Sequence, residues 1–170
     1  MAYVIFDLDG TVIDTSHRYR NNADGHCDLD FWFANSTPEM IARDTLLPLA
    51  ASMRTMFAAG HTIVICTARD FSPLNGVDLG AIYTQFLADN GLHHHACLHR
   101  LMAGPDHETM GDGALKIKLL SDYAFSQGFD TIREMGAIMF DDNLGVIRAL
   151  ADDVMMIDAT RENARLRLAA

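Results

Sequence analysis

The chain has 170 residues, 49% of them hydrophobic, so it is long enough to bury a sizeable core and short enough to form one domain. Asp and Glu number 23 against 13 Lys and Arg, and the formal charge of −10 argues against extended contact with a nucleic-acid backbone; a small phosphorylated ligand or a nucleic-acid 3′ end remains a candidate partner. The longest apolar stretches are strand-sized or broken by charges, and Met1 leads directly into one of them, so we expect no membrane span or signal peptide and a cytoplasmic protein.

Short apolar runs recur along the chain and predict the strands of a sheet. The first, YVIF, is rich in aromatic and β-branched residues, and HTIVIC and GAIMF are nearly continuous apolar runs. Runs of this length and composition are typical of parallel strands that are buried on both faces. In chain order the predicted strands are residues 3–6, 61–66, 95–99, 136–140 and 153–158.

Helical periods lie between these strands. The predicted helices are residues 38–59, 79–90, 112–127 and 144–151. Alternation of strands and helices predicts an α/β fold, here a Rossmann-like doubly wound parallel sheet of about five strands in one domain spanning residues 1–170. The segment at about 14–38 is too short for a large cap domain but long enough for a flap over a site.

Charged and hydroxyl side chains follow three of the predicted strands. Because the carboxyl ends of parallel strands meet at one edge of the sheet, we expect these side chains to converge there. Several carboxylates that converge repel one another unless a cation holds them, and oxygen ligands favour Mg²⁺ over zinc. The residues concerned are Asp7 and Asp9 after the first strand, Thr67 and Arg69 after the second, and Asp141 and Asp142 after the fourth.

Two carboxylates two residues apart can divide the work of phosphoryl transfer. One can attack phosphorus, while the second donates a proton to the leaving alcohol and later activates water. In DLDGT, Gly10 permits a sharp turn and Thr11 can support it with its side chain. A lysine is needed to balance the phosphoryl oxygens, and either Lys116 or Lys118 can supply it, but not both, because they lie two apart on one helix.

The segments DLDGT, TAR, Lys116 and DD, in this order, resemble the four motifs of the haloacid dehalogenase superfamily of phosphatases. A closer resemblance is to the 3′-phosphatase domain of phage polynucleotide kinase and its stand-alone relatives, carried by DLDGTVIDTSHR, GHTIVICTARD and IMFDDN. It implies that Arg18 and Arg69 serve the phosphate or the strand end, and it selects Lys116, which lies four residues after Asp112. The region RLMAGPDHETMGDG departs from it, because many relatives carry an arginine-rich stretch there, and no GxxxxGK[ST] kinase motif is present.

The resemblance implies a role for each motif residue in a Mg²⁺-dependent phosphatase that acts through an aspartyl phosphate. Asp7 would be the nucleophile and a metal ligand, and Asp9 the general acid and base, with its main-chain carbonyl on the metal. The other expected residues are Thr67 and Lys116, which would hold the phosphoryl group; Arg18, Arg69 and Thr11, placed in substrate binding; and Asp141 and Asp142, which would complete the metal site.

Some residues admit simpler interpretations. Asp142 could cap the following helix instead of binding a metal. The run His93, His94 and His95 most simply forms a solvated loop, with zinc binding as the alternative. His99, Arg100 and His107 are placed near the entrance of the site, where they could contact substrate.

Three functions remain open. The first is a Mg²⁺-dependent phosphomonoesterase of nucleotide or polynucleotide 3′-phosphates. The second is a phosphatase of the same chemistry that acts on a 5′-mononucleotide or another small metabolite. The third is a non-catalytic binding protein of the same fold, which the complete set of acids argues against.

Overall fold

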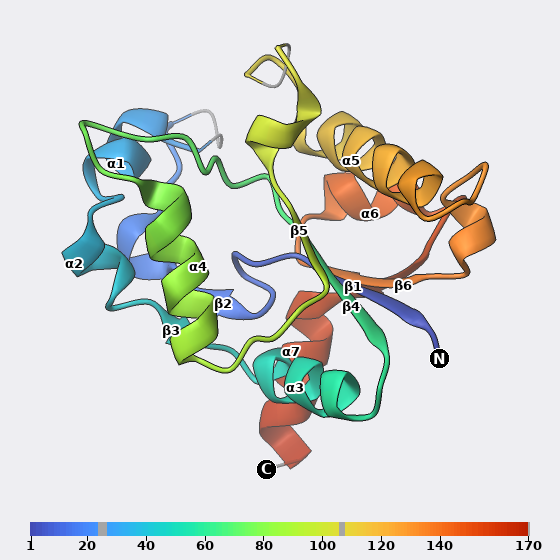
Figure 1. Cartoon of the computed structure of the whole chain (residues 1–170). Helices are drawn as coiled ribbons and strands as arrows, with labels where there is room; N and C mark the ends of the chain where they lie inside the picture. Colours follow the sequence, from blue (N-terminus) through green and yellow to red (C-terminus); the bar gives the residue numbers. More distant parts are fainter. Residues whose placement is uncertain (24–26, 106–107, 170) are drawn as a thin grey trace.

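The computed structural model of the protein describes residues 1–23, 27–105 and 108–169 (Figure 1). Its central sheet has five parallel strands in the order β5-β4-β1-β6-β7, which confirms the predicted doubly wound α/β fold. All five predicted strands are present, within three residues of the expected ends. They are β1 (Tyr3–Phe6), β4 (Thr62–Cys66), β5 (Ala96–Leu98), β6 (Ile138–Asp141) and β7 (Met155–Asp158).

The strand order places β1 at the centre of the sheet. Val4 pairs with Ile63 of β4 on one side and with Ile138 of β6 on the other. The chain builds outward from β1 in both directions, so the order reverses beside β1 and the carboxyl ends of β1, β4 and β6 border a crevice there. The fold therefore brings the residues after these three strands to one place.

Helices cover both faces of this sheet (Figure 1). On one face lie α5 (Asp112–Ser126) and α6 (Leu144–Leu150), and on the other α3 (Leu49–Ala58) and α7 (Ala159–Ala169). Alternate strand residues enter two separate cores, with Ile5 packed beneath α5 and Phe6 beneath α3. Two 3₁₀ turns, η2 (Arg100–Ala103) and η3 (Arg133–Met135), precede α5 and β6.

The single helix predicted over residues 38–59 is wrong. The segment forms α2 (Pro38–Ile41), the two-residue strand β3 (Thr45–Leu46) and then α3. Pro48 stands at the start of α3, and a proline disfavours helical backbone in the residue before it. Leu47 instead donates its N–H to the carbonyl of Val12, and β3 pairs antiparallel with β2 (Ile13–Asp14).

The helix α7 was not predicted. Its sequence, ATRENARLRLA, has no clear apolar face, and only Ala159 and Asn163 are buried. The remaining three predicted helices agree with the structure within one residue: α4 spans Leu79–Asp89, and α5 and α6 each end one residue before the predicted end. The short helix α1 (Leu29–Ala34) was not predicted either. No helix among the described residues combines the length and the apolar character needed to cross a bilayer.

No large cap domain is present in the described parts of the chain. The segment at about 14–38, in which residues 24–26 lie outside the described residues, contains η1 (Ser16–Arg18) and α1 (Leu29–Ala34), and with α2 it lies beside α4 (Figure 1). In α1, Asp28 caps the helix by accepting the N–H of Phe31. The boundaries of a functional flap stay a prediction.

Candidate active site

A cavity of about 900 Å³ lies at the carboxyl edge of the sheet. Seven of the nine predicted site residues line it, and the other two, Thr11 and Arg18, do not. Side chains from the flap segment and from the loop before α5 complete the wall. The predicted residues in the lining are Asp7, Asp9, Thr67, Arg69, Lys116, Asp141 and Asp142.

Lys116 connects the ends of two strands. From the buried face of α5 its Nζ donates to Asp7 Oδ1 and to Asp141 Oδ2, both at 2.7 Å. Lys118 points away, because residues two apart on a helix lie on opposite sides, and it pairs with Asp122 at the surface. Of the two candidate lysines, the structure therefore places Lys116 in the cavity.

Crowding of carboxylates shifts their pKa values. Burial, with help from Asp141 and Asp9, raises the pKa of Asp7 to about 8, although Lys116 opposes the shift. Burial and Asp141 likewise raise the pKa of Asp142 to about 6. Burial lowers the pKa of Lys116, but Asp7 and Asp141 outweigh it and hold the pKa above its ordinary value, so the ammonium stays charged.

The carboxylates of Asp7, Asp141 and Asp142 fit a divalent metal. One oxygen of each lies within 4.8 Å of the others, and hard oxygen ligands of this kind suit Mg²⁺. Asn143, rather than Asp142, caps α6, so the helix start does not occupy the Asp142 carboxylate. The carboxylate of Asp9, by contrast, is not part of this group.

Gly10 is needed where DLDGT turns beside this group. Its φ is +73°, a conformation that side-chain-bearing residues rarely adopt. A Cβ at this position would lie 2.2 Å from Asp142 Oδ2, far inside van der Waals contact. The glycine thus allows Asp142 to approach the turn that carries Asp9.

Asp9 and Arg69 bind each other. Arg69 donates from Nε to Asp9 Oδ2 at 3.0 Å and from Nη2 to Oδ1, so both carboxylate oxygens are engaged. Burial raises the pKa of Asp9, but the Arg69 guanidinium outweighs it and holds the pKa below its ordinary value. The Arg69 guanidinium packs 4.2 Å from the centre of the Tyr83 ring, and the main-chain N–H of Arg69 donates to Thr67 Oγ1 at 3.1 Å.

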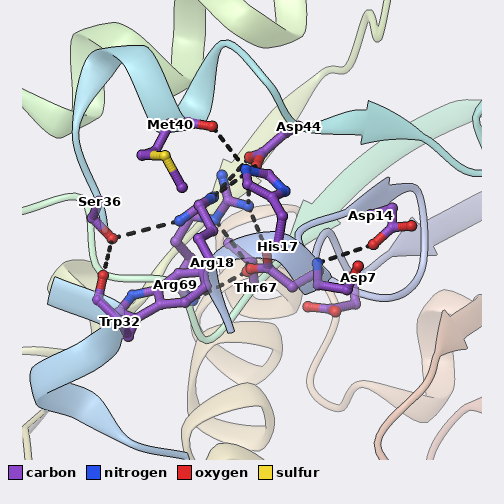
Figure 2. Close-up of polar contacts among 12 residues, drawn as sticks. Asp7, Asp14, His17, Arg18, Trp32, Ser36, Met40, Asp44, Thr67 and Arg69 are labelled. Carbon is purple, nitrogen blue, oxygen red and sulfur yellow. Dashed lines mark hydrogen bonds and ion pairs between the residues drawn. The ribbon is translucent and has the colours of Figure 1, made fainter. Parts of the chain in front are cut away.

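The substrate-binding role expected for Arg18 does not agree with its position. The side chain is fully buried and donates from Nε and Nη2 to Asp44 at 2.8 and 2.7 Å (Figure 2). Its guanidinium lies 4.3 Å from the centre of the Trp32 ring. Asp44, which the sequence analysis missed, lies 26 residues further along, and no motif or period relates the two positions.

Thr11 is likewise buried outside the cavity. Its Oγ1 has no hydrogen-bond partner among the described residues, so the side-chain support expected for the turn is absent. The turn is instead held by main-chain bonds to the Leu8 carbonyl and by Asn163, whose Nδ2 donates to the Thr11 carbonyl at 2.9 Å. Asn163 was missed because it lies in the unpredicted helix α7.

The outer wall of the cavity includes residues that no motif indicated. Arg100 lines it, as expected, and is held there by the Ala68 carbonyl and by Asp112. His99 does not line it; its ring stacks on Phe71 at 4.3 Å. His107 lies outside the described residues. The unforeseen wall residues include Tyr19, Cys27, Leu29, Phe33 and Glu108, and Trp32 lines the wall beside them.

The three consecutive histidines do not come together as a metal site. His95 accepts the N–H of Ile63 at its Nδ1, and His94 Nδ1 lies against the Leu92 carbonyl. The rings of His93 and His95 pack on Phe57. Among the described residues, the group of Asp7 and its two partners is the one cluster of His, Cys, Asp or Glu that could hold a metal.

Comparisons with known proteins agree with this fold and identify the protein family of the chain. The model of the bacteriophage T5 5′-deoxynucleotidase family matches residues 1–170. The chain belongs to this family. The 5′-deoxynucleotidase of Escherichia phage T5 is 39% identical over 70 residues, a match that covers 39% of this chain and 29% of the phage enzyme.

Solved structures show that the family member described here has the fold of haloacid dehalogenase-like hydrolases. One, from Streptococcus pneumoniae, superposes with a TM-score of 0.59 over 92% of this chain and 83% of its own at 13% identity. Another, from Geobacter sulfurreducens, gives 0.60 over 92% and 86%, also at 13% identity. These likenesses do not bear on the closer resemblance to the polynucleotide kinase 3′-phosphatase domain, which stays a prediction.

Proposed function

We propose that the protein is a Mg²⁺-dependent phosphatase that hydrolyses nucleoside 5′-monophosphates through an aspartyl phosphate. The observation that carries this proposal is the convergence of Asp7, Lys116, Asp141 and Asp142 in one cavity, in a chain that belongs to a 5′-deoxynucleotidase family. Three clustered carboxylates, two of them bonded to a buried lysine, meet no packing need that apolar residues would not meet better. The arrangement suits a site that receives a cation and a phosphoryl group.

Asp7 is the proposed nucleophile. Its carboxylate would attack phosphorus, and the ester oxygen would leave as an alcohol with a proton from Asp9, whose uptake of that proton the charge of the bound phosphate would favour by raising the pKa that Arg69 otherwise holds low. Water would then attack the phosphorus of the aspartyl phosphate while Asp9 takes its proton, which releases phosphate and restores both carboxyl groups. Mg²⁺ held by Asp7, Asp141 and Asp142 would supply positive charge that keeps these carboxylates ionised and offsets the charge of the phosphoryl oxygens.

Lys116 and Thr67 would hold the phosphoryl group. Lys116 already fixes one oxygen of Asp7, which leaves the other oxygen of the nucleophile for attack. As an ammonium with three donors, it can keep its two carboxylate bonds and turn the third donor toward a phosphoryl oxygen. Thr67 directly follows β4, as Asp7 directly follows β1, and both line the same cavity.

The cavity wall supports a nucleotide as substrate. It is polar at the sheet edge, and along the flap segment the aromatic side chains of Tyr19, Trp32 and Phe33 line it. An aromatic wall of this kind can receive a nucleobase while the phosphate lies at the carboxylates. The 5′ position is favoured over the 3′ end because the two arginines assigned to a 3′ end, Arg18 and Arg69, are bound to Asp44 and Asp9.

The test measures phosphate release with Mg²⁺ from matched esters: deoxynucleoside 5′- and 3′-monophosphates, the ribose 5′-monophosphate and a 3′-phosphorylated oligonucleotide. Wild type is compared with Asp7→Asn and with Asp122→Asn, a surface carboxylate outside the cavity. Release from 5′-monophosphates that is lost in Asp7→Asn alone would support the proposal. Release confined to 3′-phosphates would restore the 3′-phosphatase assignment, and no release from any ester would favour a binding protein.

A further inference from the structure

A chain of four alternating charges extends from the cavity into the flap segment. It runs from Asp9 through Arg69 and Asp44 to Arg18. Figure 2 shows the last three of these residues. The side chains of Arg18 and Asp44 are fully buried and do not line the cavity, whereas those of Arg69, 1% exposed, and Asp9, 30% exposed, both line it. Buried guanidinium groups keep their charge, so each needs a carboxylate close by.

Asp44 binds Arg18 and also faces Arg69, which is bound to Asp9. Its Oδ2 lies 2.7 Å from Arg18 Nη2 and 4.0 Å from Arg69 Nη2, so one oxygen faces both guanidinium groups. Both groups also lie over the same ring, Tyr83, at 6.0 and 4.2 Å from its centre. Bound to Asp44, the Arg18 guanidinium lies over the Trp32 ring and donates to Ser36 Oγ. Arg69 makes both of its side-chain hydrogen bonds to Asp9.

Without the Asp44 charge, two buried cations would face a single anion. Arg18 already acts on Asp9 through its charge, so both guanidinium groups would then be drawn to the Asp9 carboxylate. His17, whose Nε2 lies 3.5 Å from Asp44 Oδ1, is bound at the same nitrogen by the Met40 carbonyl and offers no replacement anion. The orientation of the Asp9 carboxylate thus depends on a residue that does not line the cavity.

We propose that Asp44 is a positioning residue: it holds Arg18 away from the site so that Arg69 alone orients Asp9 toward the leaving-group oxygen. This inference rests on the proposed function, in which Asp9 gives that oxygen its proton. It assigns a role in the reaction to the flap-side pair of Arg18 and Asp44, although neither residue lines the cavity.

The experiment compares two esters that differ in their need for a proton. A deoxynucleoside 5′-monophosphate releases an alcohol and needs one, whereas 4-nitrophenyl phosphate releases a stable nitrophenolate and does not. The measured quantity is kcat/KM, which covers the steps up to release of the first product. Asp44→Asn should lower kcat/KM for the nucleotide by about 10-fold or more, part of the 10²–10⁴-fold worth of a general acid, and lower that for the aryl ester by less than about 3-fold.

Two further variants separate positioning from loss of structure. In an Arg69→Gln background, Asp44→Asn should change the nucleotide kcat/KM by less than about 2-fold, because the residue through which it acts is gone. Arg18→Met combined with Asp44→Asn removes one charge of each sign and leaves Asp9 with Arg69 alone. This balanced variant should recover most of the nucleotide kcat/KM lost in Asp44→Asn.

The outcomes are distinct. Equal losses on both esters, an effect of Asp44→Asn that persists without Arg69, or no effect of Asp44→Asn in a folded protein would each overturn the inference. If Asp44→Asn does not fold, the balanced variant is compared with Arg69→Gln by the ratio of kcat/KM for the nucleotide to kcat/KM for the aryl ester. A ratio in the balanced variant as low as that in Arg69→Gln would also overturn the inference. Asp122→Asn controls for loss of a surface carboxylate, and an inactive wild type would overturn the proposed function itself.

Discussion

Replacement of Gly10 by alanine tests whether Asp142 is a metal ligand. The new Cβ would meet Asp142 Oδ2 at 2.2 Å, and because nonbonded carbon contacts are most favourable near 3.5 Å, the carboxylate must move by roughly 1 Å. Alanine at φ +73° also costs about 1–2 kcal/mol of backbone strain. Mg²⁺ tolerates little deviation from octahedral geometry, so a displaced ligand should weaken its binding by about 10- to 100-fold.

Gly128→Ala is the matched control. Gly128 also has positive φ, +86°, but its Cβ would have no atom within 4 Å. Both variants should therefore lose similar stability in thermal unfolding without metal, and only Gly10→Ala should lose Mg²⁺ affinity in calorimetric titration. Equal Mg²⁺ affinity in the two variants would refute the reasoning and remove Asp142 from the metal site.

Three further predictions concern stability, measured as the free energy of unfolding in urea. Lys116→Met should destabilise the metal-free protein by about 3–5 kcal/mol, because it leaves the buried carboxylates of Asp7 and Asp141 without their cation. Lys118→Met, at a surface ion pair, should cost at most about 1 kcal/mol. Similar losses in the two variants would contradict the buried ion-pair role of Lys116. The pKa values of Asp7 (about 8) and Asp142 (about 6) exceed their ordinary value of 3.8, so the folded state binds protons more tightly than the unfolded state. The free energy of unfolding of the metal-free protein should therefore fall as the pH rises from about 4 to 8, and Mg²⁺ should reduce this pH dependence. A pH dependence that Asp7→Asn leaves unchanged would contradict the assignment. Asn163→Leu should cost about 2 kcal/mol or more, because it strands the buried Leu49 N–H and the Thr11 carbonyl, and a neutral result would show that water replaces both bonds.

The sheet could be predicted because each strand carries its own signal. Continuous apolar runs such as HTIVIC need burial on both faces, and only a parallel sheet between helix layers provides it. The convergence of Asp7, Thr67 and Asp141 then follows from topology, since the carboxyl ends of neighbouring parallel strands share one edge. The choice between Lys116 and Lys118 needed the resemblance to a family, because helix geometry alone excludes only that both face the site.

The rest depends on contacts that no local pattern encodes. Arg18 and Asp44 pair across 26 residues, and nothing in the sequence distinguishes this buried pair from surface charges. Asp44 also lies in the segment predicted as helix, where the break imposed by Pro48 was overlooked. The polar helix α7 has no apolar period, and its buried Asn163 bonds to the turn that carries Asp9. Such features are fixed by tertiary packing rather than by propensity.

The position of β1 has a consequence for how the protein folds. The innermost strand precedes both of its neighbours in the chain, and β4 comes more than 70 residues before β6, so β1 can pair with β4 before β6 has been synthesised. During that interval the other edge of β1 carries unpaired N–H and C=O groups, which can pair with a second chain. Closing this edge requires contact between residues far apart in the sequence, which slows folding. A nascent chain therefore holds Asp7 and Asp9 on an open, association-prone edge until the strand that carries Asp141 arrives to cover it.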